Sequence, residues 1–175
     1  MNDLTNYTFD DRQVRMILPH RAPMLMVDRV LACPAALDSL HTIRQISVGD
    51  AMLPRGPGDI AFFPPTLTVE ALAHSCGLLM NLRWLLAQGV DVAAFAAGSD
   101  AALGAISIPH SVLAETRMRQ IRLVQAGDSL HMNVRITLQR GSMLRFSAQA
   151  SCAAGICTEL DVLLAFPDYM LHAAS

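Results

Sequence analysis

The chain has 175 residues, a net charge of -2 and 53% hydrophobic residues. This length is enough for one domain with a substantial core, and the slightly acidic balance argues against a general nucleic-acid binder. The mean hydropathy of +0.36 is high for a soluble protein, so we expect part of the surface to be buried against a partner subunit.

The N-terminal stretch MNDLTNYTFDDRQ is polar and acidic, which is not the pattern of a signal peptide. The four cysteines (Cys33, Cys76, Cys152, Cys157) have neither the spacing of a metal site nor the density of a disulfide framework. Free thiols fit a reducing compartment, so we expect a cytoplasmic protein. The sequence has no internal repeat, linker or low-complexity tract, and we interpret residues 1–175 as a single domain.

The first predicted element is a short helix over residues 8–18, capped by Thr8 or Asp10 and ended by Pro19. The segment 19–23 is bracketed by two prolines, which predicts a turn or an extended stretch. Strands over residues 25–33 and 37–48 then form a hairpin, because apolar residues dominate both and Pro34 lies between them. Residues 49–65 are rich in glycine and proline, and a long loop of this kind often carries function.

Residues 66–88 are apolar around most of the circumference of a helix, which predicts a long helix buried at the centre of the domain. Pro64 and Pro65 come at its start, where their missing N–H groups would be unpaired anyway, and Gly89 follows as its C-terminal cap. The length approaches that of a membrane span, but a glutamate such as Glu70 is costly inside a bilayer. We therefore expect no membrane span.

The polar residues of this helix fall near one stripe, because they are three, four or seven positions apart. They are Thr66, Glu70, His74, Gly77, Asn81 and Gln88. Glu70 and His74 are four apart, so their side chains can meet. A carboxylate inside an apolar helix must be paired, hydrogen-bonded or protonated. Glu70 is therefore either a structural acid that its surroundings satisfy or a general acid or base.

Residues 91–112 are small and apolar without clear periodicity, and we interpret them as an insertion or lid with a short strand. Antiparallel strands follow, since apolar and polar residues alternate. Their predicted ranges are 113–124, 129–138, 142–153 and 156–166. Two strands, one long helix and then antiparallel strands predict an α+β fold in which one sheet wraps around the helix. Such a sheet leaves an edge that a second subunit would cover.

This order of elements is that of the hot dog fold, and two motifs resemble one family with that fold. Residues 17–30, ILPHRAPMLMVDRV, closely resemble the N-terminal signature of the 3-hydroxyacyl-ACP dehydratases of fatty acid synthesis. Residues 65–79, PTLTVEALAHSCGLL, resemble the start of that family's central helix, which carries a catalytic carboxylate and, four residues later, a glutamine. The AGD turn at 126–128 also resembles the family, and the similarity spans most of the chain except roughly residues 91–112. The resemblance implies that Glu70 is the catalytic acid.

One feature of that family has no counterpart in this sequence. The family's catalytic histidine lies in a Gly-His-Phe-Pro-Gly loop just before the helix. Here the loop is contracted to GDIAFFPP at residues 58–65 and contains no histidine. The shortened loop resembles a divergent branch of predicted dehydratases from aryl-polyene and related pigment-lipid gene clusters. The resemblance therefore implies the fold and the ligand class, but it does not supply the second catalytic group.

Removing water from a 3-hydroxyacyl thioester needs a base for the α-proton, an acid for the departing hydroxyl and donors for the enolate-like oxygen. His74 occupies the family's glutamine position, one turn from Glu70, and is one candidate for the missing group. His20 in the PHR turn is another, and a loop histidine from a different subunit is a third, because hot dog sites form at dimer interfaces. The structural alternatives are a satisfied core residue for His74 and a turn-fixing residue for His20.

Five further residues are expected to position the substrate or the loop. They are Arg21, Asp28, Arg29, Phe63 and Pro65. An ion pair between Asp28 and Arg29 is the structural alternative for those two residues.

Three arginines near one predicted strand, Arg117, Arg119 and Arg122, are expected to contact an acidic carrier protein or its phosphopantetheine. The alternative is a solvated strand face. The sequence has no metal or nucleotide motif, so we expect no cofactor beyond the phosphopantetheine of the carrier.

The first functional hypothesis is a 3-hydroxyacyl-ACP dehydratase-like lyase that uses Glu70 and a non-standard second group in fatty-acid or polyene-like biosynthesis. The second is a non-catalytic hot dog subunit that pairs with an active dehydratase, which the missing loop histidine favours. The third is an acyl thioesterase, in which Glu70 activates water. In each case we expect a homodimer or a heterodimer with another hot dog subunit.

Overall fold

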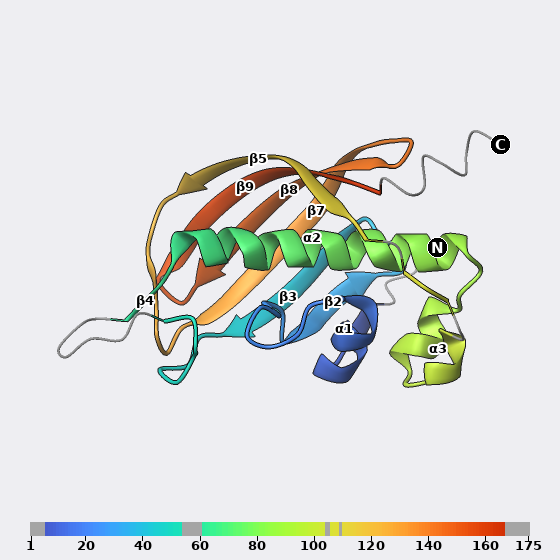
Figure 1. Cartoon of the computed structure of the whole chain (residues 1–175), viewed down its shortest axis with the longest axis horizontal. Coiled ribbons are helices and arrows are strands. Elements are labelled where there is room, and N and C mark those ends of the chain that lie inside the picture. Colours follow the sequence, from blue (N-terminus) through green and yellow to red (C-terminus); the bar gives the residue numbers. More distant parts are fainter. Residues whose placement is uncertain (1–5, 54–60, 104–105, 109, 167–175) are drawn as a thin grey trace.

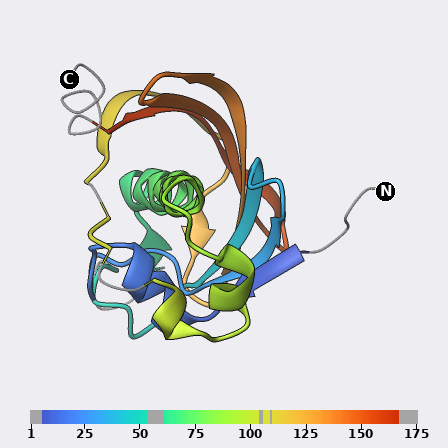
Figure 2. The ribbon, with the colours of Figure 1, turned by 90° about the vertical axis from the view of Figure 1, so that its right-hand side faces the viewer.

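The computed structural model describes residues 6–53, 61–103, 106–108 and 110–166. Its largest element is an antiparallel sheet of seven strands (Figure 1). In spatial order the strands are β1 (Asn6–Phe9), β2 (Arg29–Pro34), β3 (Ser39–Gln45), β7 (Ser129–Arg140), β8 (Met143–Cys152), β9 (Gly155–Ala165) and β5 (Val112–Gln120). A separate pair joins β4 (Phe62–Phe63) to β6 (Val124–Gln125). The sheet curves around helix α2 (Pro65–Ala87), as Figure 2 shows along the helix axis. This is the predicted α+β arrangement of one sheet wrapped around one long helix.

Helix α2 is buried because nearly every side of it is apolar. Leu72 and Leu78 have no exposed surface, and burying one leucine side chain stabilises a fold by about 1.5–3 kcal/mol. The helix begins and ends one residue earlier than the predicted range of 66–88. Gly89 follows it with a φ of 83°, the left-handed conformation that ends many helices.

One buried hydrogen-bond chain fixes the rotation of α2 against the sheet. The hydroxyl of Ser75 donates to the carbonyl of Ala71 at 2.9 Å, and its oxygen lies 2.8 Å from the hydroxyl of Thr42 on β3. Since Ser75 has only one proton to donate, Thr42 is the donor to Ser75. The bond therefore helps to determine which residues of α2 face the sheet and which face away from it.

The N-terminal helix α1 (Asp11–Ile17) corresponds to the helix predicted over residues 8–18. Its cap is Asp10, which forms a reciprocal capping box with Gln13, while Thr8 belongs to β1. The side-chain amide of Gln13 also donates to the carbonyl of Phe95 at 2.6 Å. This bond ties α1 to α3 (Val92–Ala96), and the two helices lie together across the open side of the sheet (Figure 2).

The segment predicted as an insertion with a short strand is helical over part of its length, and its described residues 106–108, 110 and 111 have no regular structure. It contains α3 and a single 3-10 turn, η1 (Asp100–Ala102). The prediction of a strand there was wrong, because the alanine-rich stretch favours helix once Asp91 caps it by accepting from the backbone N–H of Ala94. Residues 104, 105 and 109 of the predicted lid lie outside the described residues, as do residues 54–60 of the predicted loop.

Two strand predictions need correction, and two short strands were missed. The strand expected over 25–33 begins only at Arg29, and residues 25–28 form an extended segment that does not belong to the sheet. The strand expected over 113–124 is divided into β5 and β6, because β6 leaves the main sheet to pair with β4. Strands β1 and β4 were not predicted at all, since four and two residues are too few for a period to be recognised.

Strand β5 is the outer edge of the sheet and pairs only with β9. Met118 on β5 lies opposite Leu160 on β9, so both side chains point to the concave face of the sheet. Leu160 is 3% exposed, whereas Met118 is 43% exposed. Within the described part of the chain, the apolar inner face of the edge strand is therefore uncovered.

None of the helices in the described ranges combines the length and the apolar character that a bilayer crossing requires.

Candidate active site

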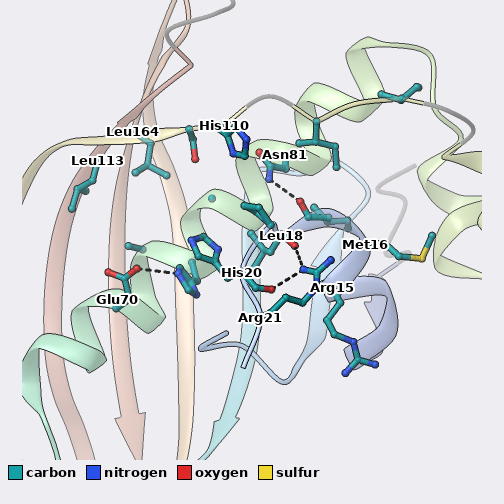
Figure 3. A pocket seen from close by; sticks show the side chains of 18 residues that line it. Arg15, Met16, Leu18, His20, Arg21, Glu70, Asn81, His110, Leu113 and Leu164 are labelled. Atoms are coloured by element: carbon teal, nitrogen blue, oxygen red, sulfur yellow. Dashed lines mark hydrogen bonds and ion pairs between the residues drawn. The ribbon is translucent and has the colours of Figure 1, made fainter. Parts of the chain in front are cut away.

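A cavity of about 400 Å³ lies beside α2. Four members of the predicted polar stripe line it: Glu70, His74, Gly77 and Asn81. The opposite wall comes from α1 and the turn that follows it, and the start of β5 closes a third side (Figure 3). The ends of the stripe, Thr66 and Gln88, are exposed and do not line the cavity.

A cluster of two histidines and one carboxylate lies in the wall of this cavity. Nε2 of His74 is 3.0 Å from Oε1 of Glu70, and the ring of His20 stacks on that of His74 with 3.9 Å between the centroids. One ring nitrogen of each histidine and one carboxylate oxygen of Glu70 lie within 4.8 Å of one another. The first sequence motif and the helix motif therefore meet at this point.

Glu70 is not a buried acid, as its position in an apolar helix suggested. Its side chain is 37% exposed, because it opens into the cavity, whereas the side chain of His74 is 4% exposed. The 3.0 Å contact between them does not have the angle of a hydrogen bond, and Nε2 of His74 has no aligned partner among the described residues. A small rotation of either side chain would align it.

The backbone fixes the tautomer of His74. The N–H of Met26 donates to Nδ1 of His74 at 3.3 Å, so this nitrogen carries a lone pair and the proton of the neutral ring lies on Nε2. The proton on Nε2 faces the carboxylate of Glu70. His74 is therefore built to donate to Glu70.

Burial keeps both histidines neutral. Desolvation, together with the neighbouring His20, lowers the pKa of His74 to about 3. Desolvation also lowers the pKa of His20, while the carboxylate of Glu70 opposes this shift. Nδ1 of His20 is buried without a hydrogen-bond partner in the described ranges. At neutral pH the cavity wall thus holds two neutral imidazoles beside one carboxyl group.

The turn that carries His20 is held by its own neighbours. The guanidinium of Arg21 donates to the carbonyls of Leu18 at 2.9 Å and of His20 at 2.7 Å. Arg21 also lines the cavity, so it both fixes the turn and contributes positive charge there.

The segment that carries Met26 is held by Asp28 and Arg44. Arg44 donates to the carbonyl of Leu25 at 3.1 Å and to the carboxylate of Asp28 at 3.2 Å. Asp28 also accepts from the backbone N–H of Gln45 at 2.7 Å. The conformation that brings Met26 to His74 therefore depends on these two residues, which do not themselves touch the cavity.

The same three clustered side chains are a poor metal site, for reasons of proton placement and geometry. A metal on Nε2 of His74 would need the proton moved to Nδ1, where it would oppose the N–H of Met26. The two imidazoles are stacked within 28° of parallel, so their in-plane lone pairs do not converge on one point.

Other predicted positioning residues lie away from the cavity. Asp28 pairs with Arg44, and among the described residues it forms no ion pair with Arg29, which is exposed. Phe63 is fully buried where β4 pairs with β6, and Pro65 is the first residue of α2. These two residues orient the helix start and do not line the cavity.

The three arginines predicted to meet a carrier protein are all exposed. Arg119 already pairs with Glu159 at 2.6 Å, and Arg122 donates to the carbonyl of Ala154. Arg117 has no described ion-pair partner, so it is the freest of the three for a new contact.

Sequence reasoning missed several residues of the site. His110 and Ser111 line the cavity, and the charge of His110 lowers the pKa of His20. The backbone N–H of Met26 donates to His74, and Arg44 holds the segment that carries Met26. Arg44, His110 and Ser111 stand in no motif, and Met26 lies in the 17–30 motif but contributes its backbone N–H, which a residue type does not reveal.

Comparison with curated proteins finds relatives over nearly the whole chain. A 3-hydroxyacyl-[acyl-carrier-protein] dehydratase, FabZ, of Legionella pneumophila (strain Corby) is 29% identical over 161 residues, which cover 91% of this chain and 95% of the relative. The protein of the same name from Shewanella amazonensis is 27% identical over 158 residues, which cover 90% and 92%. No model of a protein family matches the chain.

Solved structures show the same fold. A chain of the dehydratase heterocomplex ApeI:P from Xenorhabdus doucetiae superposes with a TM-score of 0.68 at 15% identity, over 93% of this chain and 97% of that chain. A sigma28-regulated virulence protein from Campylobacter jejuni superposes with a TM-score of 0.59 at 12% identity, over 91% of both chains. The hot dog fold predicted from the order of elements is confirmed.

Proposed function

We propose that this chain, a member of the hot dog fold family of the 3-hydroxyacyl-ACP dehydratases, removes water from 3-hydroxyacyl thioesters. The substrate would be carried by an acyl carrier protein in fatty-acid or polyene-like biosynthesis. The observation that carries the proposal is the cluster of His20, Glu70 and His74 in the wall of a cavity that polar and apolar side chains line together. The cavity has the size of a ligand site, and the cluster holds a base and an acid within reach of one bound group.

The catalytic roles follow from the protonation of the three groups. His20 is neutral, so it can take the proton from C2 of the substrate. The carboxyl group of Glu70, when it carries the proton, gives that proton to the hydroxyl on C3. The C–O bond then breaks, water leaves, and the electron pair of the C2–H bond becomes the double bond between C2 and C3. The proton on His20 passes back to Glu70, which lies within 4.8 Å, and the cycle closes.

His74 is a positioning residue in this scheme. It cannot serve as the acid, because a neutral imidazole is a weak acid, and its Nδ1 is occupied by the N–H of Met26. Its Nε2–H faces Glu70 and holds the carboxyl group toward His20. The histidine that the family has in its loop is thus replaced by one from the first motif, and no cofactor is needed beyond the phosphopantetheine of the carrier.

The carrier protein and the partner subunit are part of the proposal. Arg117, Arg119 and Arg122 lie along or just after the edge strand β5, where an acidic carrier protein would meet positive charge. A second hot dog subunit, identical or different, would cover the apolar inner face of β5. Pairing along β5 would satisfy an open strand edge and bury residues such as Met118.

The test is an assay of the purified protein with a 3-hydroxyacyl-ACP substrate in the cytoplasmic pH range, followed by mass spectrometry of the acyl-ACP product. The proposal predicts loss of one water, and that loss should disappear in the Glu70→Gln variant. Release of free acid would indicate a thioesterase instead.

The exposed apolar inner face of β5 also favours a second candidate, a non-catalytic subunit that completes the site of an active partner. This candidate predicts no reaction by the chain alone, and a reaction that depends on the chain once a hot dog subunit with the loop histidine is added. The two candidates are therefore separated by one assay with and without the added subunit.

A further inference from the structure

Asn81 is a buried amide on the otherwise apolar helix α2, about three turns and roughly 16 Å along the axis from Glu70. The residue is 3% exposed and lines the same cavity as the catalytic cluster. Its Nδ2 donates to the carbonyl of Ile17 at 3.1 Å. Its Oδ1 is buried and has no hydrogen-bond partner among the described residues.

The orientation of this amide is determined by its partner. A backbone carbonyl such as that of Ile17 only accepts hydrogen bonds, so the reversed amide would place two acceptors against each other. The unpaired atom is therefore the oxygen. A buried acceptor without a donor is unfavourable, and such atoms in native proteins are usually satisfied by a group that the structure does not contain.

The cavity extends from Glu70 to Asn81. Figure 3 shows Glu70 toward one end of the cavity and Asn81 toward the other, with the turn of His20 between them. Ala73 and Gly77 lie on α2 between these two residues, and a Cβ at Gly77 would meet only Oγ of Ser111, at 3.8 Å. The small residues leave space for a chain that begins at the catalytic cluster and passes along the helix.

We propose that this cavity selects acyl chains with a hydroxyl group at their distal end, and that Oδ1 of Asn81 accepts the hydrogen bond of that hydroxyl. The inference rests on the proposed function, because it places the thioester end of the substrate at Glu70. A hydroxyl fits better than a charged amine, since Arg15 and Arg21 line the same cavity and would repel a second cation. A methyl end would leave the acceptor buried and unpaired.

The experiment compares pairs of 3-hydroxyacyl-pantetheine thioesters of equal chain length, one ending in a hydroxyl and the other in a methyl group, over a series of lengths. The wild-type protein should prefer the hydroxyl-terminated member by roughly 10- to 100-fold in kcat/KM at the length that reaches Asn81, the range expected when a buried polar group loses its partner. The Asn81→Leu variant, of similar volume, should lose or reverse the preference. Equal turnover of both members at every length, or an unchanged preference in the variant, would overturn the inference.

Asn81→Leu also removes the bond to Ile17, so its fold must be checked by circular dichroism and thermal unfolding. A second variant, Gly77→Ile, leaves Asn81 and its bond to Ile17 intact and obstructs the route along α2. It should abolish the preference for the hydroxyl end. If the preference survived this obstruction, the hydroxyl would be recognised somewhere other than Asn81, and the inference would be wrong.

Binding separates this inference from the proposed function. Unreactive analogues that lack the 3-hydroxyl group and carry an amide in place of the thioester can be titrated by calorimetry. Tighter binding of the hydroxyl-terminated analogue without any dehydration would support the selectivity of the cavity and reject the dehydratase. Dehydration of both substrates with equal binding of both analogues would support the dehydratase and reject the selectivity of the cavity.

Discussion

The imidazole ring of His20 lies flat on that of His74, with 3.9 Å between the ring centroids and 28° between the planes. The contact joins two sequence motifs that are more than 50 positions apart and brings the free imidazole to the carboxyl group of Glu70. Protonation of one ring disfavours protonation of the other, which is why the pKa of His74 is lowered by His20 as well as by burial. The stack therefore helps to keep His74 uncharged, while burial lowers the pKa of His20.

The first prediction concerns His20. The His20→Gln variant should lose roughly 10²- to 10⁴-fold in kcat, because a general base contributes about that much to a rate. The KM should change little, since glutamine retains a polar side chain at the same place. Steady-state kinetics on a 3-hydroxyacyl-ACP substrate measures both constants.

His131→Gln is the matched control for this substitution. His131 is a histidine of β7 that contacts His41, with 3.1 Å between their ring nitrogens, and it does not line the cavity. It should keep the wild-type kcat. If both variants lost activity to the same extent, the loss would report a general effect of replacing histidine and His20 would not be the base.

The second prediction concerns Glu70. Glu70→Gln is nearly isosteric and should abolish dehydration, because an amide cannot supply the proton that the C3 hydroxyl takes. The fold should be retained, since the Glu70 side chain is 37% exposed and makes no aligned hydrogen bond in the described structure. Circular dichroism tests whether the fold is retained, and the product assay tests whether dehydration is lost. Full turnover by the variant would make Glu70 a structural residue.

The sequence predicted the wrapped sheet, the long helix and the polar stripe, because each of these follows from a periodic pattern. The pairing of Glu70 with His74 was also predictable, since residues four apart on a helix meet. The approach of His20 to them was not, because it depends on a turn held by Arg21 and on the path of residues 25–28.

The failed strand prediction over 25–28 has a related cause. Met26 and Val27 are buried, and the bonds of Asp28 and Arg44 hold their segment, so the composition of a strand occurs in residues that are not part of the sheet. A pattern of apolar residues reports burial and does not distinguish the structures that achieve it.

The third prediction is a pH dependence of stability that belongs to His74. Its pKa is about 3 in the folded protein and about 6.5 in the unfolded chain. Between these values the unfolded chain binds a proton that the folded protein excludes, so stability is lost as the pH falls below about 6.5. The contribution approaches about 1.4 kcal/mol per pH unit within this window.

His74→Gln removes this titration and should give a shallower loss of stability between pH 6.5 and pH 4 than the wild type. Urea unfolding at several pH values measures the two slopes. Equal slopes would mean that His74 is not held neutral in the folded state. Glutamine is also the family's residue at this position, so an unchanged kcat in the variant would remove His74 from the mechanism.

The last prediction concerns the partner subunit at β5. Met118 points to the concave face of the sheet but is 43% exposed, whereas the facing Leu160 is buried. Met118→Arg places a charge on the concave face of β5, where a second copy paired along this strand would have to bury it. We therefore expect the dimer to dissociate, which sedimentation equilibrium measures as a fall in mass.

Val48→Arg is the control, because Val48 is an 80% exposed apolar residue away from β5 and its replacement should leave the mass unchanged. A wild-type chain that sediments as a monomer, or a dimer that survives Met118→Arg, would show that β5 is not the interface between identical copies.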